Sequence, residues 1–194
     1  MKTKEMALIS TFAVLTAVTA RITIPLPVIP FTMQPTMWTL SGLLLGSRLG
    51  PASQLLYIVM GLIGIPVFVG GGGPEYIFSP TFGYLIGSVA CSWLAGRIVE
   101  KWRSEGIRIT RAKNYFAGLA GLLVAYCFAV LYLYALKNFW MPGEGMTFFR
   151  VVTVGFLTTI GPDLLKLLIV AIVAERLQAS LPHLFNSPAM QRAN

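Results

Sequence analysis

Two residues of opposite charge stand close together near the start of the last apolar segment, in the run Gly161-Pro162-Asp163-Leu164-Leu165-Lys166. Asp163 and Lys166 are three positions apart, so on a helix their side chains share one face. A charge at membrane depth costs about 2.5–3.5 kcal/mol on insertion scales, and such a residue therefore indicates a functional site. The pair could present an acceptor and a cation to a ligand with hydrogen-bond donors and an anionic end. The alternative is an ion pair that only stabilises its own helix.

A proline-rich loop that precedes the second apolar segment offers further ligand contacts. Prolines recur between Pro25 and Pro35, and each fixes its own φ angle. The stiff, extended segment that results is expected to hold Phe31, Thr32 and Gln34 in fixed positions.

A second loop contains four consecutive glycines, 70–73, followed by aromatic residues. Gly71 and Gly72 permit close backbone approach and leave N–H groups open to a ligand. Aromatic side chains after the glycines can stack on a flat ligand ring and, where they are tyrosines, hydrogen-bond at its edge. These side chains are Tyr76, Phe78 and Tyr84. A flexible connector and an interfacial aromatic belt are the alternatives.

The composition shows what kind of elements must position these residues. The chain has 194 residues, of which 56% are hydrophobic and 11% charged, and its mean hydropathy is +0.73. A soluble domain carries about 25% charged residues, so most of this surface is apolar. That excludes an ordinary cytosolic enzyme, a disulfide scaffold and a disordered chain. A spanning helix needs about 20 apolar residues, so the length allows five or six spans and no separate soluble catalytic domain.

Hydropathy and the Gly and Pro breakers predict an all-α membrane protein, a compact bundle of six transmembrane helices forming one domain over residues 1–194. The predicted spans are about 6–24, 36–48, 52–69, 81–99, 115–136 and 162–180. Gly50 and Pro51 are expected to turn the chain between the second and third spans. Gly161 and Pro162 are expected to break the last apolar region, so that the final helix begins at Pro162.

The distribution of Lys and Arg predicts that both termini are cytoplasmic. Fifteen basic residues stand against seven acidic ones, giving a formal charge of +8. One predicted face collects Lys2, Lys4, Arg48, Arg97, Lys101, Arg103, Arg108, Arg111, Lys113, Arg176 and Arg192. The opposite, outer face has Arg21, Lys137 and Arg150, together with both loops described above. The basic face suits contact with anionic membrane lipid, whereas no segment has the exposed aromatics that nucleic-acid binding would need.

Motifs for catalysis are missing from the sequence, so we do not expect an enzyme. There is no GxxxxGK[ST] motif for ATP hydrolysis and no HExxH, and the single histidine, His183, lies beyond the last span. The apolar segments lack a serine with a neighbouring base, which makes an intramembrane enzyme acting on lipid a weak alternative. No metal or other cofactor is expected. A solitary ion- or proton-coupled small-molecule transporter, with Asp163 as the coupling group, is the stronger alternative.

The first predicted span has small residues at helical spacing. Ala13 and Ala17 are four positions apart, and Ala20 follows about one turn later. Small residues at this spacing let another helix approach closely. That helix could belong to the same chain or to a partner protein.

Three segments in this order, IPLPVIPFTMQ, GIPVFVGGGGPEYIFSPTFGY and GPDLLK, resemble the BioY family, the biotin-specific S-components of energy-coupling-factor (ECF) vitamin transporters. The resemblance spans residues 25–166. It implies a six-helix, multi-pass protein of the bacterial cell membrane that captures biotin with high affinity from outside. It also implies partners, namely a transmembrane coupling protein and ATPase subunits. An S-component for another vitamin is the alternative within this fold.

The resemblance further implies roles for individual residues. Asp163 would accept from the ureido N–H groups of biotin, and Lys166 would pair with its carboxylate or its ureido carbonyl. Gln34 in the first loop and the glycine loop, with Gly71 and Gly72, would belong to the pocket, and Tyr84, Phe31, Tyr76 and Phe78 would enclose the ring. Ala13 and Ala17 would contact the coupling protein. Where some relatives have an asparagine, residues 70–73 are all glycine, which leaves only backbone contacts there.

Overall fold

The computed structural model describes residues 3–26, 28–141, 145–181 and 184, and most of them are helical. The longer helices are α1 (Thr3–Arg21), α2 (Gln34–Leu62), α3 (Phe82–Ser104), α4 (Arg111–Ala135) and α6 (Thr158–Ser180). The shorter elements are β1 (Thr23–Ile24), β2 (Phe31–Thr32), η1 (Pro74–Phe78), η2 (Leu136–Trp140), α5 (Phe148–Val152) and η3 (Thr153–Leu157). Lys2, His183 and Arg192 lie outside the described residues.

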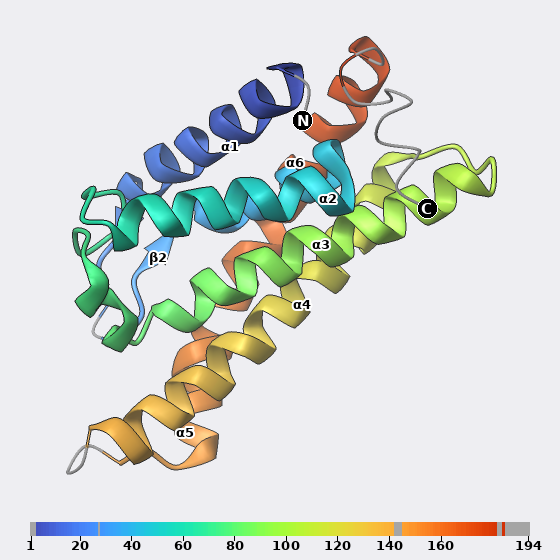
Figure 1. Cartoon of the computed structure of the whole chain (residues 1–194). Helices are drawn as coiled ribbons and strands as arrows, with labels where there is room; N and C mark the ends of the chain where they lie inside the picture. Colours follow the sequence, from blue (N-terminus) through green and yellow to red (C-terminus); the bar gives the residue numbers. More distant parts are fainter. Residues whose placement is uncertain (1–2, 27, 142–144, 182–183, 185–194) are drawn as a thin grey trace.

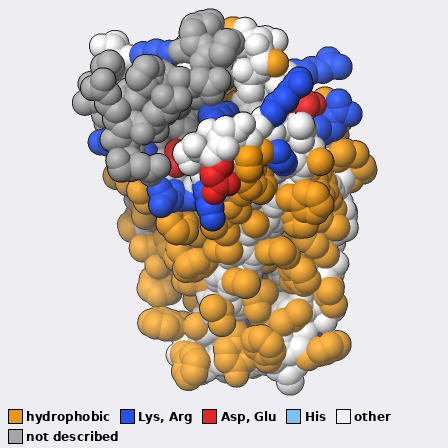
Figure 2. All heavy atoms as spheres, turned by 90° about the vertical axis from the view of Figure 1, so that its right-hand side faces the viewer, with side chains coloured by type: hydrophobic (Ala, Val, Ile, Leu, Met, Phe, Trp, Pro, Cys, Tyr) orange, Lys and Arg blue, Asp and Glu red, His pale blue; other side chains and the backbone are white. Residues whose placement is uncertain are grey.

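Four helical stretches of the described chain are long and apolar enough to cross a membrane: Gln34–Leu62, Phe82–Ser104, Arg111–Trp140 and Phe148–Ser180. Large apolar side chains on them face outward; Leu131 is 62% exposed and Leu165 66%. Figure 2 shows hydrophobic side chains over most of one face, with Lys and Arg gathered at one end. These features define a helical membrane protein, as the composition predicted.

Helix α2 reverses direction at Gly46, which has φ +81° and ψ −175°. Gln54 Nε2 donates to Ser41 Oγ over 3.2 Å, although residues thirteen apart in a straight helix would be separated by about 20 Å. The two arms of α2 therefore lie side by side (Figure 1). The turn predicted at Gly50 and Pro51 is wrong, because Pro51 lies inside the second arm.

Glu100 of α3 stabilises this reversal. Its Oε1 accepts from the Ser47 main-chain N–H at 2.8 Å and its Oε2 from the Ser47 hydroxyl at 2.6 Å. The carboxylate thus satisfies a donor at the start of the second arm, as a capping residue would.

Small residues let α2 and α3 approach closely. A Cβ added to Gly42 would lie 2.4 Å from the Ser92 carbonyl oxygen, and one added to Gly96 would lie 2.5 Å from the Gly46 backbone. Because lipid is as apolar as a side chain, such close packing is what holds membrane helices together.

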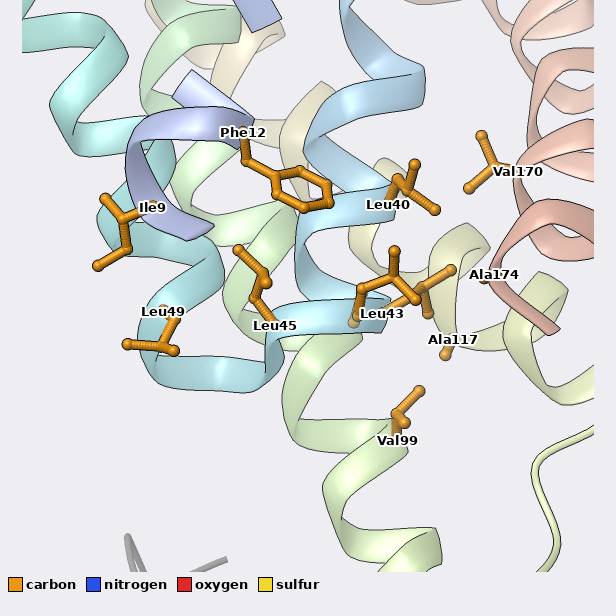
Figure 3. Close-up of a cluster of buried hydrophobic side chains, with 12 residues drawn as sticks. Ile9, Phe12, Leu40, Leu43, Leu45, Leu49, Val99, Ala117, Val170 and Ala174 are labelled. Atoms are coloured by element: carbon orange, nitrogen blue, oxygen red, sulfur yellow. The ribbon is translucent and has the colours of Figure 1, made fainter. Parts of the chain in front are cut away.

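The core on the basic side of the bundle joins α1, α2, α3, α4 and α6 (Figure 3). Its fully or nearly buried members include Ile9, Phe12, Leu40, Leu43, Leu45, Leu49, Val99, Ala117, Val170 and Ala174. Phe12 of α1 points toward Leu40 of α2 in this view. Arg111 and Glu175, paired at 3.3 Å, join the start of α4 to the end of α6 at the same end of the molecule.

Two predicted helix limits are wrong. The second arm of α2 ends at Leu62 rather than near 69, because Gly64 turns the chain with φ +104°. The final helix does not begin at Pro162; α5, η3 and α6 follow one another without a break from Phe148 to Ser180. The η3 segment is a π-helical turn, which lies just before the proline that removes one backbone donor from α6.

Candidate ligand-binding pocket

A cavity opens at the end of the bundle where the β1–β2 hairpin, the glycine loop and the first turns of α2, α3 and α6 meet. It holds about 600 Å³ of unfilled space, part of which is open solvent. Its lining is Ile29, Pro30, Phe31, Thr32, Gln34, Pro35, Trp38, Tyr57, Phe68, Val69, Tyr76, Thr81, Tyr84, Leu85, Leu122, Ala125, Tyr126, Thr159 and Asp163.

Asp163 and Lys166 form a buried ion pair at the inner side of this cavity. Their side chains are only 4% and 8% exposed, and Asp163 lines the cavity wall. The Tyr126 hydroxyl donates to the other carboxylate oxygen of Asp163. Two buried charges tolerate removal from water only when further hydrogen bonds satisfy them, and Tyr126 supplies one for the acid.

Lys166 is held in turn by the proline-rich loop. Its ammonium donates to the Thr32 main-chain carbonyl at 2.6 Å and lies 4.0 Å from the centre of the Phe31 ring. A cation over an aromatic face is stabilised by the ring's quadrupole. The pair predicted on α6 and the aromatic predicted in the first loop therefore belong to one cluster.

Five of the predicted site residues line the cavity: Phe31, Gln34, Tyr76, Tyr84 and Asp163. Gln34 Nε2 donates to the Tyr57 hydroxyl at 2.8 Å, and that hydroxyl donates to the Val67 carbonyl at 3.2 Å. These contacts position the loops around the cavity.

Other predicted residues lie outside the cavity lining. Lys166 borders a smaller adjoining space beneath Asp163. Gly72 packs against the turn that follows α2, since an added Cβ would lie 2.2 Å from the Ile65 carbonyl oxygen. Gly71 has φ +119° and accepts from Phe68 N–H at 2.8 Å. Phe78 is 53% exposed. The structure thus does not bring Gly71, Gly72 or Phe78 to the cavity wall.

Ala13 and Ala17 face the chain's own helices. Ala13 is fully buried in a cluster with Tyr57 of α2, and Ala17 packs against the same cluster. The outward side of α1 carries Val14 and Val18, each 54% exposed. In this arrangement Ala13 has no surface left for a partner protein.

The lining residues that sequence reasoning missed include Trp38, Tyr57, Tyr126 and Thr159. A tyrosine inside an otherwise apolar helix was a usable signal for Tyr57 and Tyr126. Thr159 stands four positions before Asp163, which places both on one face of α6. Nothing in the sequence around Trp38 distinguishes it from a core residue.

The fold and the pocket together define a helical membrane protein built to enclose a small molecule at one end. A crystal structure described as the S-component for biotin from an ECF-type ABC transporter has the same fold, with a TM-score of 0.82 over 95% of this chain and 99% of that one, at 19% identity. The BioY family matches residues 1–183, and the chain belongs to this family.

Relatives named as biotin transporters match the sequence of this chain over most of their length. The probable biotin transporter BioY of Lysinibacillus sphaericus is 42% identical over 175 residues, covering 90% of this chain and 87% of the relative. The protein of the same name from Pyrococcus horikoshii is 35% identical over 182 residues, covering 93% and 99%. The biotin transporter BioY of Thermotoga maritima is 33% identical over 168 residues, covering 86% and 91%. The resemblance found in the sequence is confirmed.

Proposed function

We propose that this chain captures biotin on the outer side of the bacterial cell membrane and serves its uptake as the substrate-binding component of an ECF-type transporter. One observation carries the proposal: in a member of the BioY family, a buried acid–base pair, Asp163 and Lys166, stands at the wall of an aromatic-lined cavity. The names of the relatives, which describe biotin transporters, support the same ligand.

The chemistry of biotin suits this cavity. Its ureido group has two N–H donors and a carbonyl acceptor, its thioether ring is apolar, and its valerate chain ends in a carboxylate. Asp163 would accept from the ureido N–H groups, and Lys166 would pair with the carboxylate or the ureido carbonyl. Phe31, Tyr76 and Tyr84 would enclose the ring. Nanomolar capture needs about −12 kcal/mol, which a largely buried ligand with satisfied polar contacts can supply.

The glycine loop would complete the site when it moves. Gly71, Gly72 and Phe78 lie outside the cavity lining, so their expected contacts with biotin require the loop to shift inward on binding. Gln34 would act from the first position of α2, where its amide already contacts Tyr57.

Six membrane crossings follow if α1 and each arm of α2 cross as well as α3, α4 and the α5–α6 stretch. The reversal at Gly46 supports two separate crossings for α2. The 19 residues of α1 rise about 28 Å, close to the ~30 Å hydrocarbon thickness. With basic residues at the end opposite the cavity, both termini would be cytoplasmic, and residues 1–194 would form one multi-pass substrate-binding domain.

Energy for release would come from partners. We propose that the chain is not an enzyme and that a transmembrane coupling protein and ATPase subunits supply the ATP hydrolysis for which it has no P-loop. Ala17, on the inner side of α1, could reach the coupling protein only if α1 moved relative to α2. Anionic lipid would contact the basic end.

Competition binding tests the substrate. Membranes that contain this chain would bind radiolabelled biotin saturably, and unlabelled biotin would displace the label, whereas thiamine and riboflavin at the same excess would not. Displacement by another vitamin would reassign the ligand, and the absence of saturable biotin binding to folded protein would contradict the proposal.

A further inference from the structure

Trp38 occupies an unusual position in the cavity wall. It lies one turn into α2, its side chain is 3% exposed, and it lines the cavity. Its indole N–H is fully buried, and no acceptor lies within hydrogen-bonding distance in the described part of the chain. Buried polar groups are nearly always paired, and an exception in a native structure indicates a missing partner.

The other hydrogen-bond donors around the cavity already have partners. The hydroxyls of Tyr57, Tyr84, Tyr126 and Thr159 donate to Val67, Gly155, Asp163 and Phe156, respectively. The Gln34 amide donates to Tyr57. Among the buried side-chain donors of the described lining, the indole N–H of Trp38 is the one that has no hydrogen-bond partner.

Trp38 and Asp163 both line the cavity and are linked through two tyrosines. The Tyr126 hydroxyl donates to Asp163, and the rings of Tyr126 and Tyr84 meet edge to face with centroids 6.0 Å apart. Tyr84 packs against the buried cluster that contains Trp38 and Ala125. One wall therefore offers a neutral donor and an anionic acceptor, joined by the two tyrosines.

We propose that Trp38 determines ligand specificity by donating its indole N–H to the ureido carbonyl of biotin while Asp163 accepts from an adjacent ureido N–H. This inference rests on the proposed function and deepens it. A cyclic urea carries its acceptor and its donors on neighbouring edges of one ring, which matches a wall with one donor and one acceptor.

The arrangement also orients the ligand. A carboxylate placed beside Trp38 would approach the negative charge of Asp163, whereas the neutral urea meets no such repulsion. A ligand without an acceptor at the ureido position leaves the Trp38 N–H buried and unpaired, and a site of this kind rejects such analogues strongly.

Two measurements test the inference, the first on the unmodified chain in detergent. In a ¹⁵N–¹H spectrum of the indole groups, the Trp38 resonance is expected to move downfield on saturation with biotin, as a new hydrogen bond requires. The Trp93 resonance, from a side chain 51% exposed on α3, is expected to stay in place. In the second measurement, Trp38→Phe is expected to weaken biotin binding about 5- to 150-fold, the range for a buried polar group left unpaired.

Trp93→Phe serves as the matched control and is expected to bind biotin like the unmodified chain. A Trp38 indole resonance unchanged at saturating biotin would overturn the inference while the biotin assignment stands, and so would full affinity in a folded Trp38→Phe variant. If the Trp38→Phe variant does not fold, the spectrum of the unmodified chain still decides. If the folded, unmodified chain does not bind biotin, the proposed function fails and this inference is overturned with it.

Discussion

The Lys166 ammonium of α6 donates to the Thr32 carbonyl of β2 at 2.6 Å, across 134 positions of the chain. The same ammonium pairs with Asp163 and lies over the Phe31 ring. The Lys166 ammonium thereby connects the proline-rich loop to Asp163 in the cavity wall. A ligand carboxylate that approaches Lys166 would compete with the Thr32 carbonyl, which couples ligand binding to the position of the first loop.

Replacing Lys166 tests how far the fold depends on this connection. Lys166→Met leaves the Asp163 carboxylate buried without its cation, and we expect a loss of about 3–5 kcal/mol of unfolding free energy. Thermal unfolding in detergent measures the loss. The double variant Asp163→Asn with Lys166→Met is expected to recover part of it, because no unpaired charge remains. Lys101→Met, at an exposed position, is the control; a Lys166→Met variant as stable as this control would refute the connection.

Tyr126→Phe removes the hydroxyl that donates to Asp163. Because the carboxylate loses a buried hydrogen bond, we expect biotin binding to weaken about 5- to 150-fold while the helices stay folded. Calorimetric titration measures the affinity. Tyr115→Phe, on the same helix and in ring contact with Phe116, is the matched control. Equal affinity in the Tyr126 and Tyr115 variants would show that Tyr126 does not position the acid.

The two phenylalanines predicted in the loops, Phe31 and Phe78, are expected to differ in how much they contribute to biotin affinity. Phe31 lines the cavity and lies under Lys166, so Phe31→Ala removes both packing area and the cation–π contact, and affinity is expected to fall at least about tenfold. Phe78 is 53% exposed and lies outside the lining, so it contacts biotin only if the glycine loop shifts inward, and Phe78→Ala is expected to lower the affinity less than Phe31→Ala does. A larger loss in the Phe78 variant would mean that the glycine loop closes over the ligand further than proposed.

Gly46→Ala tests the reversal of α2. An added Cβ would lie 2.3 Å from Glu100 Oε1, and the positive φ disfavours any side chain. We expect a loss of about 2 kcal/mol or more of unfolding free energy, measured by thermal unfolding. Gly161→Ala is the control, since nothing lies within 4 Å of its added Cβ and alanine favours a helix over glycine. An unchanged midpoint in the Gly46 variant would contradict the described turn.

The acid and base of the site could be found from the sequence, together with part of the cavity lining, namely Phe31, Gln34, Tyr76 and Tyr84, whereas the rest of the pocket could not. Asp163 and Lys166 stand out because charges are costly in an apolar segment, and their spacing puts them on one helix face. Trp38 and Tyr126 reach the cavity only because α2 and α4 pack against the start of α6, and no local pattern encodes that packing. Gly71 and Gly72 have the composition of a ligand-binding loop, but Gly71 pairs with Phe68 through the main chain and Gly72 packs against the Ile65 carbonyl.

The helix boundaries, like the site, could be predicted only in part from the sequence. Hydropathy located the apolar helices. It could not decide whether α2 turns at Gly46 or at Gly50, because the position of the turn depends on a distant residue. Glu100 supplies hydrogen bonds to Ser47, and that contact favours the reversal at Gly46 over one at Gly50. The sequence predicted a break at Pro162, but the helix continues through this residue, and a π-helical turn precedes α6.

Calorimetric titration of the detergent-purified chain with biotin, beside its Asp163→Asn variant, tests the central claim most directly. We predict tight, one-to-one binding by the unmodified chain and its loss in the variant, with thermal unfolding confirming that both are folded. A folded chain that does not bind biotin, or an Asp163→Asn variant that binds it equally well, would contradict the claim that Asp163 holds biotin in this cavity.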